Sequence, residues 1–245
     1  MRIRVVLLAS ALLAPLAAGP LAAQHLVPDS LFRTRAPARP VIRVWEAGLL
    51  VGLGAGAMAI DRSVRDDAQE DRTPFRNHLS DFGNAFGNKL YVYPALALGA
   101  LGGKAIGSKG LTRISWHSLE ATALAGISVE IVKTAVGRRR PDVSPGDPFT
   151  FRGATFTDNS FPSGHTAIAF ALATTLAGET RDHWSDSGFY GAAALTGFAR
   201  VNDDKHWLSD TVFGAALGIM SARLVQRWHR PLIVGPGVVA ASFAF

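Results

Sequence analysis

Six apolar stretches, each containing alanine or glycine, leave this chain of 245 residues few folds to adopt. The stretches lie near 44–60, 90–103, 114–136, 165–178, 188–201 and 210–225. Alternation of apolar and polar residues, which is typical of a half-buried strand, is not sustained before residue 232, so each stretch is predicted to be a helix. Glycines such as Gly56, Gly214 and Gly218 are poor helix formers in water, yet they let neighbouring helices approach closely. We therefore expect an all-α protein, with a six-helix bundle over residues 43–230.

Composition favours a bundle that is embedded in a membrane. Charged residues make up 18% of the chain and hydrophobic residues 48%, whereas ordinary soluble domains have roughly 25% charged residues. A helix of about 14 residues reaches only about 21 Å, however, and a bilayer core is roughly 30 Å thick, so some stretches fit a water-soluble core equally well. The connection 61–88 is polar, and from Asp61 to Arg72 it mixes both charge signs in the way of a solvated surface helix. We assign no chemistry to those charges.

The two ends of the chain differ from the bundle. Residues 1–23 combine Arg2 and Arg4 with a short apolar run and small residues, the pattern of a secretory signal peptide. An uncleaved anchor helix is the alternative, although prolines interrupt the run, and either segment would export the chain. Residues 24–42 are rich in proline and arginine and predict an extended lead-in. Residues 231–245 form an apolar tail that could be a terminal strand.

Charge and cysteine content narrow the classes of function. The chain has 25 Lys and Arg against 19 Asp and Glu, which suits nucleic acid, phosphorylated small molecules or lipid head groups as partners. Export argues against nucleic acid, and no segment looks like a groove-reading helix or an aromatic-lined RNA surface. Because the chain has no cysteine, disulfides, thiolate metal clusters and cysteine nucleophiles are excluded.

Two clusters at expected helix ends combine a cation or a histidine with tight backbone. Lys133 lies near the end of one helix, and Arg140 follows after six residues, directly before a proline that stops the helix from continuing. Ser163, Gly164 and His165 precede the helix expected over 166–176. A Ser-Gly pair at a helix start exposes backbone N–H groups to an anion, and the helix dipole adds favourable potential. Each cluster alone also fits a structural role, as a solvated helix end or an N-cap.

A third cluster contains Arg200, His206 and Asp210. The last two are four residues apart, so on a helix they would share a face and the carboxylate could orient the imidazole. Together the three clusters supply two histidines, at least three cations and a backbone anion site, which fits phosphoryl transfer without a metal. The residues alone do not say which histidine attacks phosphorus and which protonates the leaving group. A zinc site formed by His165, His206 and Asp210 is the competing interpretation, which the nearby cations disfavour.

The three clusters resemble the signature of the type 2 phosphatidic acid phosphatase superfamily, which also contains bacterial acid phosphatases and vanadium haloperoxidases. The match spans residues 133–210, all three spacings agree, and the departure is Ala199, where the family usually has serine. The resemblance implies a helical bundle, no cofactor and no metal, with His206 as the nucleophile that forms a phosphohistidine. It further implies that Asp210 holds the other ring nitrogen of His206 and that His165 is the general acid. The implied phosphate-binding residues are Lys133, Arg140, Ser163, Gly164 and Arg200.

The expected substrate is a phosphorylated lipid, because an apolar bundle lets the lipid chain stay in the bilayer while the head group reaches the basic site. A soluble periplasmic acid phosphatase acting on small phosphoesters is the close alternative. A vanadium haloperoxidase and a membrane protein without turnover are further alternatives, and the chain is short for the former. Cations such as Lys104, Lys109 and Arg223 lie at the helix ends opposite the clusters, which favours a bacterial-type inner membrane with a periplasm-facing site.

Overall fold

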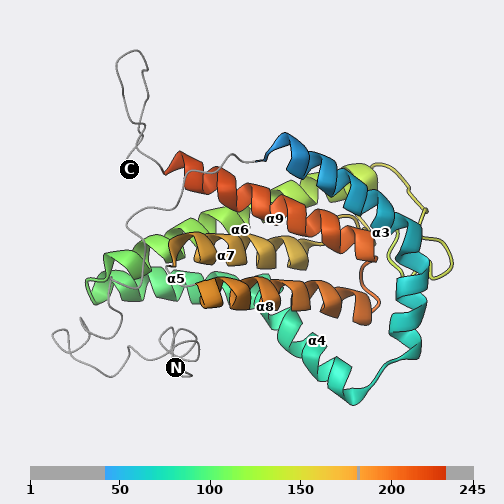
Figure 1. Cartoon of the computed structure of the whole chain (residues 1–245), viewed down its shortest axis with the longest axis horizontal. Helices are drawn as coiled ribbons and strands as arrows, with labels where there is room; N and C mark the ends of the chain where they lie inside the picture. The colour runs from blue at the N-terminus through green and yellow to red at the C-terminus, as the bar shows by residue number, and fades with distance from the viewer. Residues whose placement is uncertain (1–41, 181–182, 230–245) are drawn as a thin grey trace, which may run out of the picture.

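Helices account for most of the residues that the structure, a computed structural model, describes: 42–180 and 183–229 (Figure 1). These ranges contain α3 (Val44–Glu70), α4 (Pro74–Gly87), α5 (Lys89–Ala105), α6 (Lys109–Val136), α7 (Gly164–Glu179), α8 (His183–Asn202) and α9 (Leu208–Trp228). Extended pairing within them is limited to two isolated bridges, so the all-α prediction is confirmed. The predicted signal peptide over 1–23, the lead-in up to residue 41 and the possible strand in 231–245 lie outside the described residues.

Helix α7 is the centre of the bundle and packs against α6, α8 and α9 (Figure 1). Its side chains Ala167, Ala169, Ala171 and Ala173 have no surface exposed to solvent. A helix that is apolar on every face is stable only where neighbours cover all of it. Alanine suits this position because it has the highest helix propensity and a side chain small enough for three helices to approach.

Glycines on α9 permit its close contact with the start of α7. A Cβ atom added at Gly214 would lie 2.5 Å from the carbonyl oxygen of Ser163, and one added at Gly218 would meet the carbonyl of Ala167 still more closely. The prediction that these glycines serve close helix packing is confirmed. Gly56 on α3 differs, since a Cβ there would have no neighbour within 4 Å.

The described residues contain seven helices, so the predicted number of six is corrected. The polar connection 61–88 is itself helical: α3 continues to Glu70, and α4 follows with Thr73 as its N-cap. Helix α4 packs against α8, and its buried residues are Ser80, Gly83 and Gly87. Phe75, Leu79, Phe82 and Phe86 recur at helical spacing, so the sequence does contain a signal for this helix, and the polar residues between them conceal it.

Within the described residues, α3 and α9 are long and apolar enough to cross a membrane. Helix α3 has 27 residues rather than the 17 of the predicted stretch, which gives it a length of about 40 Å. Large apolar side chains are exposed on α3, α5 and α6, among them Leu53, Leu98 and Ile131. Large apolar side chains exposed on several helices are typical of contact with lipid or with a protein partner.

The end of α6, the start of α7, the end of α8 and the start of α9 meet at one end of the bundle, at the right in Figure 1. Hydrogen bonds join them there, among them the following two. The backbone N–H of Ser163 donates to the carbonyl of Asp210 at 2.9 Å, and the indole N–H of Trp207 donates to the carbonyl of Arg139 at 3.0 Å. The predicted meeting of the three clusters at one end is therefore confirmed.

Candidate active site

The first cluster is held by the backbone at the end of α6. Gly137 adopts the left-handed conformation, with φ of 61°, and its N–H caps the helix by donating to the carbonyl of Lys133. A Cβ at Gly137 would collide with the carbonyl of Gly153, so glycine is required there on two counts. The helix ends before Pro141, as predicted, and the charge of Arg140 acts on His165 in the first turn of α7.

The second cluster begins α7 two residues earlier than predicted. Ser163 is the N-cap, has no exposed surface, and accepts hydrogen bonds from the backbone N–H and the hydroxyl of Thr166. Gly164 is therefore the first residue of the helix and His165 the second. The N–H groups of this first helical turn have no partner within the helix, so the anion site that the sequence predicts is available at this end of α7.

In the third cluster His206 and Asp210 form the expected pair, although not on one helix. His206 lies in the turn before α9, with 3% of its side chain exposed, whereas Asp210 lies in the first turn of α9. Asp210 reaches back because its Oδ2 atom accepts a hydrogen bond from the backbone N–H of Trp207 at 2.9 Å. The Nδ1 atom of His206 lies 3.5 Å from the same Oδ2, an ion-pair distance, and forms no hydrogen bond with any described residue. The pairing is confirmed, and the shared helical face is corrected.

Three cations surround the two histidines. Lys133 is in the last turn of α6, Arg140 follows that helix, and Arg200 is in the last turn of α8. The charges of all three act on the ring of His165, which requires them to lie near it. The structure therefore brings the predicted cations and both histidines together from three helices and two connecting segments.

Burial is the main cause of the low basicity of both histidines. It lowers the pKa of His165 to about 4, and the charges of Arg200, Lys133 and Arg140 act in the same direction. Burial also lowers the pKa of His206 to about 4, although the neighbouring Asp210 counteracts that shift. Both rings are consequently neutral at pH 7 in the protein without substrate. A neutral His206 has a free lone pair with which to attack phosphorus.

Three arginines of the segment 133–210 have buried donor atoms without partners. The Nε atoms of Arg140 and Arg200, and that of Arg139, are buried and form no hydrogen bond with any described residue. Buried donors are nearly always paired in folded proteins. The unpaired Nε donors of Arg140 and Arg200, whose charges act on Lys133 and His165, match the need of a phosphate, whose oxygens accept several hydrogen bonds at once.

One contact of Arg200 comes from α4, which lies in the predicted polar connection. Asn84 of α4 accepts a hydrogen bond from Nη1 of Arg200 at 2.7 Å, and it donates one to Asp203 at 2.6 Å. Asn84 belongs to none of the three clusters, and it lies 116 positions from its partner. No signal in the sequence pairs the two, because the contact depends on the packing of α4 against α8.

The donor set does not favour a metal. Among the described residues, no three His, Asp or Glu side chains are grouped so that they could hold an ion. The zinc site considered for His165, His206 and Asp210 is therefore not supported by the geometry.

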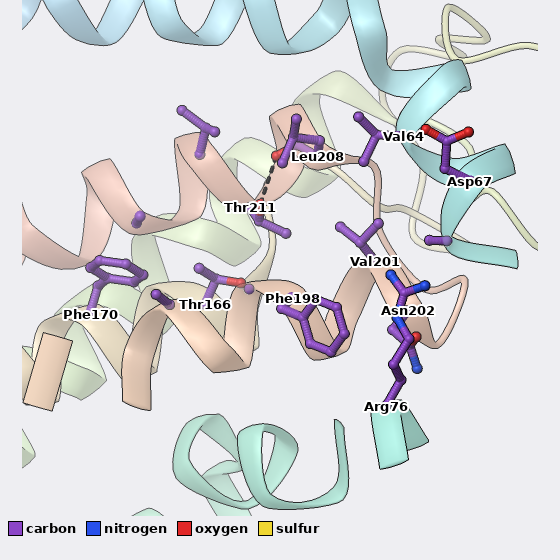
Figure 2. Close-up of a pocket in the computed structure, with 15 residues that line it drawn as sticks. Val64, Asp67, Arg76, Thr166, Phe170, Phe198, Val201, Asn202, Leu208 and Thr211 are labelled. Atoms are coloured by element: carbon purple, nitrogen blue, oxygen red, sulfur yellow. Dashed lines mark hydrogen bonds between the residues drawn. The ribbon is translucent and has the colours of Figure 1, made fainter. Parts of the chain in front are cut away.

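An apolar hollow of about 450 Å³ lies between α7, α8 and α9 (Figure 2). Phe170, Phe198 and Leu208 line it, with Val64 and Asp67 of α3 at one side. None of the predicted site residues lines the hollow. Its walls are nevertheless their immediate neighbours in the chain, because Thr166 follows His165 and Val201 follows Arg200.

Comparison with known proteins supports this architecture. A sequence model described as PAP2 superfamily matches residues 115–233. The lipid A 1-phosphatase of Porphyromonas gingivalis is 36% identical over 128 residues, which are 49% of this chain and 26% of that protein. The chain thus spans about a quarter of that relative. The probable diacylglycerol pyrophosphate phosphatase 1 of Schizosaccharomyces pombe is 29% identical over 67% of this chain and 71% of its own length.

The fold also matches a solved structure. It is similar to a transmembrane PAP2 type phosphatidylglycerolphosphate phosphatase from Bacillus subtilis, with a TM-score of 0.58 and 20% identity, over 74% of this chain and 92% of the other. The matched family segment, 115–233, contains all three clusters. It does not contain α3, α4 or α5.

Proposed function

Because residues 115–233 of this chain belong to the PAP2 superfamily, we propose that the protein is a metal-independent phosphatase that hydrolyses phosphomonoesters or pyrophosphates of lipids. The observation that carries the proposal is the convergence of two neutral histidines and three cations at one end of the bundle. The names of the two relatives, a lipid A 1-phosphatase and a probable diacylglycerol pyrophosphate phosphatase, agree with lipid phosphates as the substrate class.

The proposed reaction has two steps. In the first, the free Nε2 lone pair of His206 attacks phosphorus, a P–N bond forms, and the P–O bond to the leaving group breaks. His165 donates its proton to that oxygen, and Asp210 stabilises the positive charge on the imidazole of His206 through Nδ1. In the second step a water gives a proton to His165 and its oxygen attacks phosphorus, so the P–N bond breaks and inorganic phosphate leaves.

Lys133, Arg140 and Arg200 hold the nonbridging oxygens of the phosphate in this scheme, with the backbone N–H groups at Gly164 and the cap formed by Ser163. Charge on those oxygens changes as the reaction proceeds, so fixed cations in a buried site lower the barrier without a metal ion. A bound dianion also offsets the cations that act on His165. The pKa of His165 then rises, which favours the protonated form of this ring that the first step needs.

The apolar surroundings favour a lipid over a small soluble phosphoester. The 450 Å³ hollow lies between helices that include those carrying His165 and Arg200, and it is lined mainly by apolar side chains. A single acyl or prenyl chain fits such a space, whereas a small phosphoester has no apolar chain to place in it. The exposed apolar residues of α3, α5 and α6 would lie in the bilayer.

We further propose that the site faces outward from a bacterial-type inner membrane. The side chains of Trp45, Trp116, Trp184 and Trp228 lie at the end of the bundle away from the site and are 56–77% exposed, whereas the fifth tryptophan is buried. Exposed tryptophans are typical of a membrane–water interface. Lys104 and Lys109 lie at the same end, which agrees with a cytoplasmic face there.

The test is phosphate release by the purified full-length protein in the presence of EDTA. The panel contains phosphatidate, phosphatidylglycerol phosphate, undecaprenyl pyrophosphate and p-nitrophenyl phosphate, and the variants are His206→Ala and His165→Ala. We expect release from a lipid that EDTA does not affect and that both variants lose. Activity lost to EDTA would contradict the metal-free mechanism. Release from p-nitrophenyl phosphate alone would favour the soluble acid phosphatase.

A further inference from the structure

A buried network of charges lies behind the nucleophile pair, and its members are not among the predicted site residues. Arg138 has no exposed surface. Its Nη1 atom donates to Oδ1 of Asp210 at 2.6 Å and to Oγ of Ser209 at 2.7 Å. Its Nη2 atom donates to Oδ2 of Asp61 at 2.7 Å, and its Nε atom donates to the carbonyl of Pro148 at 2.8 Å. The guanidinium group is thus hydrogen-bonded through all three of its nitrogens.

Asp61 brings α3 into this network. Its side chain has no exposed surface, so the expectation that the charges from 61 onward form a solvated surface is wrong for this residue. Oδ1 of Asp61 accepts a hydrogen bond from the backbone N–H of Ser209 at 2.8 Å, and Oδ2 accepts one from its hydroxyl at 2.6 Å. Ser209 lies in the first turn of α9, so a carboxylate from α3 caps the helix that carries Asp210.

The network fixes Asp210 at both of its oxygens. Arg138 holds Oδ1, and the backbone N–H of Trp207 holds Oδ2, which leaves Oδ2 directed toward Nδ1 of His206. A buried guanidinium paired with Asp210 alone would neutralise the charge that the imidazole needs. Two carboxylates share this one guanidinium, so the buried group keeps a net charge of −1. That charge favours the positive His206 of the transition state.

We propose that Asp61 and Arg138 are positioning residues for the His206 nucleophile, and that they act through Asp210. This inference rests on the proposed function, because it assigns a role in a reaction that begins with attack by His206. Asp61 lies outside the segment that the PAP2 superfamily model matches, so α3 contributes to the site as well as to the bundle. Neither residue touches the phosphate in this scheme.

The experiment is a double-mutant cycle on the full-length protein with dioctanoyl phosphatidate as the probe. Asp61→Asn keeps the shape of the side chain and removes its charge. We expect it to lower kcat at least about tenfold while KM changes less than about twofold, because the lost interaction is made in the transition state. In an Asp210→Asn background the same substitution should change kcat less than about twofold, since residues that act as a unit are not additive.

The matched control is Asp204→Asn, which removes another ion pair that α3 makes with the turn before α9. Arg65 donates to Asp204 from Nε at 2.7 Å and from Nη2 at 2.8 Å, and neither residue contacts Asp210. Asn tolerates the positive φ of 57° at this position. We expect a kcat within about twofold of wild type. If Asp61→Asn does not fold, Arg138→Lys takes its place in the cycle, because lysine keeps the cation but not the three-nitrogen contact.

The outcomes separate the two proposals. Equal losses from Asp61→Asn in the wild-type and Asp210→Asn backgrounds would show a structural role and overturn the inference, as would a folded Asp61→Asn protein with wild-type kcat. Activity that requires His206 but is insensitive to Asp61 and Arg138 would contradict the positioning role alone. A wild-type protein that releases no phosphate would contradict both proposals.

Discussion

Asn84 on α4 accepts a hydrogen bond from Nη1 of Arg200 on α8 at 2.7 Å. The same nitrogen of Arg200 lies 3.9 Å from the carboxylate of Asp203, to which Asn84 also donates at 2.6 Å. The amide therefore forms a hydrogen bond with each member of this long ion pair. Its position keeps the guanidinium available to the phosphate site.

Replacing this amide is expected to weaken substrate binding more than turnover. In Asn84→Ala, Arg200 loses its partner and can turn to Asp203. A hydrogen bond to a charged group contributes about 1.5–3 kcal/mol, so KM for dioctanoyl phosphatidate should rise at least about tenfold, with kcat changed less. The matched control is Asn77→Ala on the same helix, because Asn77 contacts Asn202 rather than Arg200. An equal rise of KM in the control would attribute the effect to the packing of α4.

The pH dependence of activity follows from the two histidines. His206 must be neutral to attack and His165 must be protonated to donate, and the pKa of each is about 4 in the free protein. The correctly protonated fraction therefore decreases as pH rises above about 4. We expect kcat/KM for p-nitrophenyl phosphate to be highest on the acid side of neutrality and to fall toward pH 8. The decrease of kcat with pH should occur at a higher pH than the decrease of kcat/KM. The reason is that bound phosphate offsets the charges of Arg200, Lys133 and Arg140 on His165.

The control for this prediction is the profile of His165→Asn, which retains the titration of the substrate but not that of the acid. A kcat/KM that increases steadily to pH 8 in the wild-type protein would contradict the assignment of His165 as the proton donor.

The stability of the folded protein should increase with pH, whereas activity should decrease with pH. The pKa of an unperturbed histidine is about 6.5, and burial lowers that of His206 to about 4 in the folded protein. Between these values the unfolded chain binds more protons than the folded one, so stability is fully present above about pH 6.5 and is lost as pH falls toward 4. We expect the Tm of the detergent-solubilised protein to decrease over this range, and to decrease less in His206→Gln. Equal decreases in both proteins would exclude His206 as the cause.

The sequence predicts both the fold class and the residues of the three clusters, for different reasons. Helices such as α7 are apolar over most of their length, so composition and length reveal them. Lys133, His165 and His206 can be identified from the sequence because each lies in a cluster with a fixed spacing along the chain. That spacing does not depend on how the helices pack. The order of roles between the two histidines comes from the family resemblance and remains a prediction.

The residues that the sequence does not yield are those that act across long distances in the chain. Asn84 and Asp61 reach the site only because α4 packs on α8 and α3 packs on α9. For Asp61 a signal exists: it follows Ala57 by four positions on the buried face of α3, and both side chains are buried. A charge on the buried face of a helix requires a partner. The mixed charges after residue 61 conceal that signal, because they average it into a polar segment.

The hollow of Figure 2 distinguishes a lipid substrate from a small one. Gly197 lines it, and a Cβ there would meet Thr211 at an ordinary 3.7 Å, so a larger side chain enters the space without moving the backbone. We expect Gly197→Leu to raise KM for a long-chain phosphatidate about tenfold and to leave p-nitrophenyl phosphate unaffected, since the tail alone loses contacts. Gly191→Leu on the same helix is the control, because a Cβ there has no neighbour within 4 Å. Equal effects on both substrates would exclude the hollow as a tail site.

Gly214 tests how closely α9 must approach the start of α7. A Cβ at this position would lie 2.5 Å from the carbonyl oxygen of Ser163, so Gly214→Ala forces the two helices apart. The shift would lengthen the 2.9 Å hydrogen bond from Ser163 N–H to the carbonyl of Asp210 and move His206 relative to His165. A displacement of about 1 Å can cost about a hundredfold in rate, and we expect a loss of kcat of that order.

The control is Gly56→Ala on α3, which makes the same chemical change where a Cβ has no neighbour within 4 Å. It should keep wild-type kcat and gain up to about 1 kcal/mol in stability, because alanine favours a helix over glycine. Retention of wild-type kcat in Gly214→Ala would mean that catalysis tolerates a looser contact between the two helices than the geometry implies.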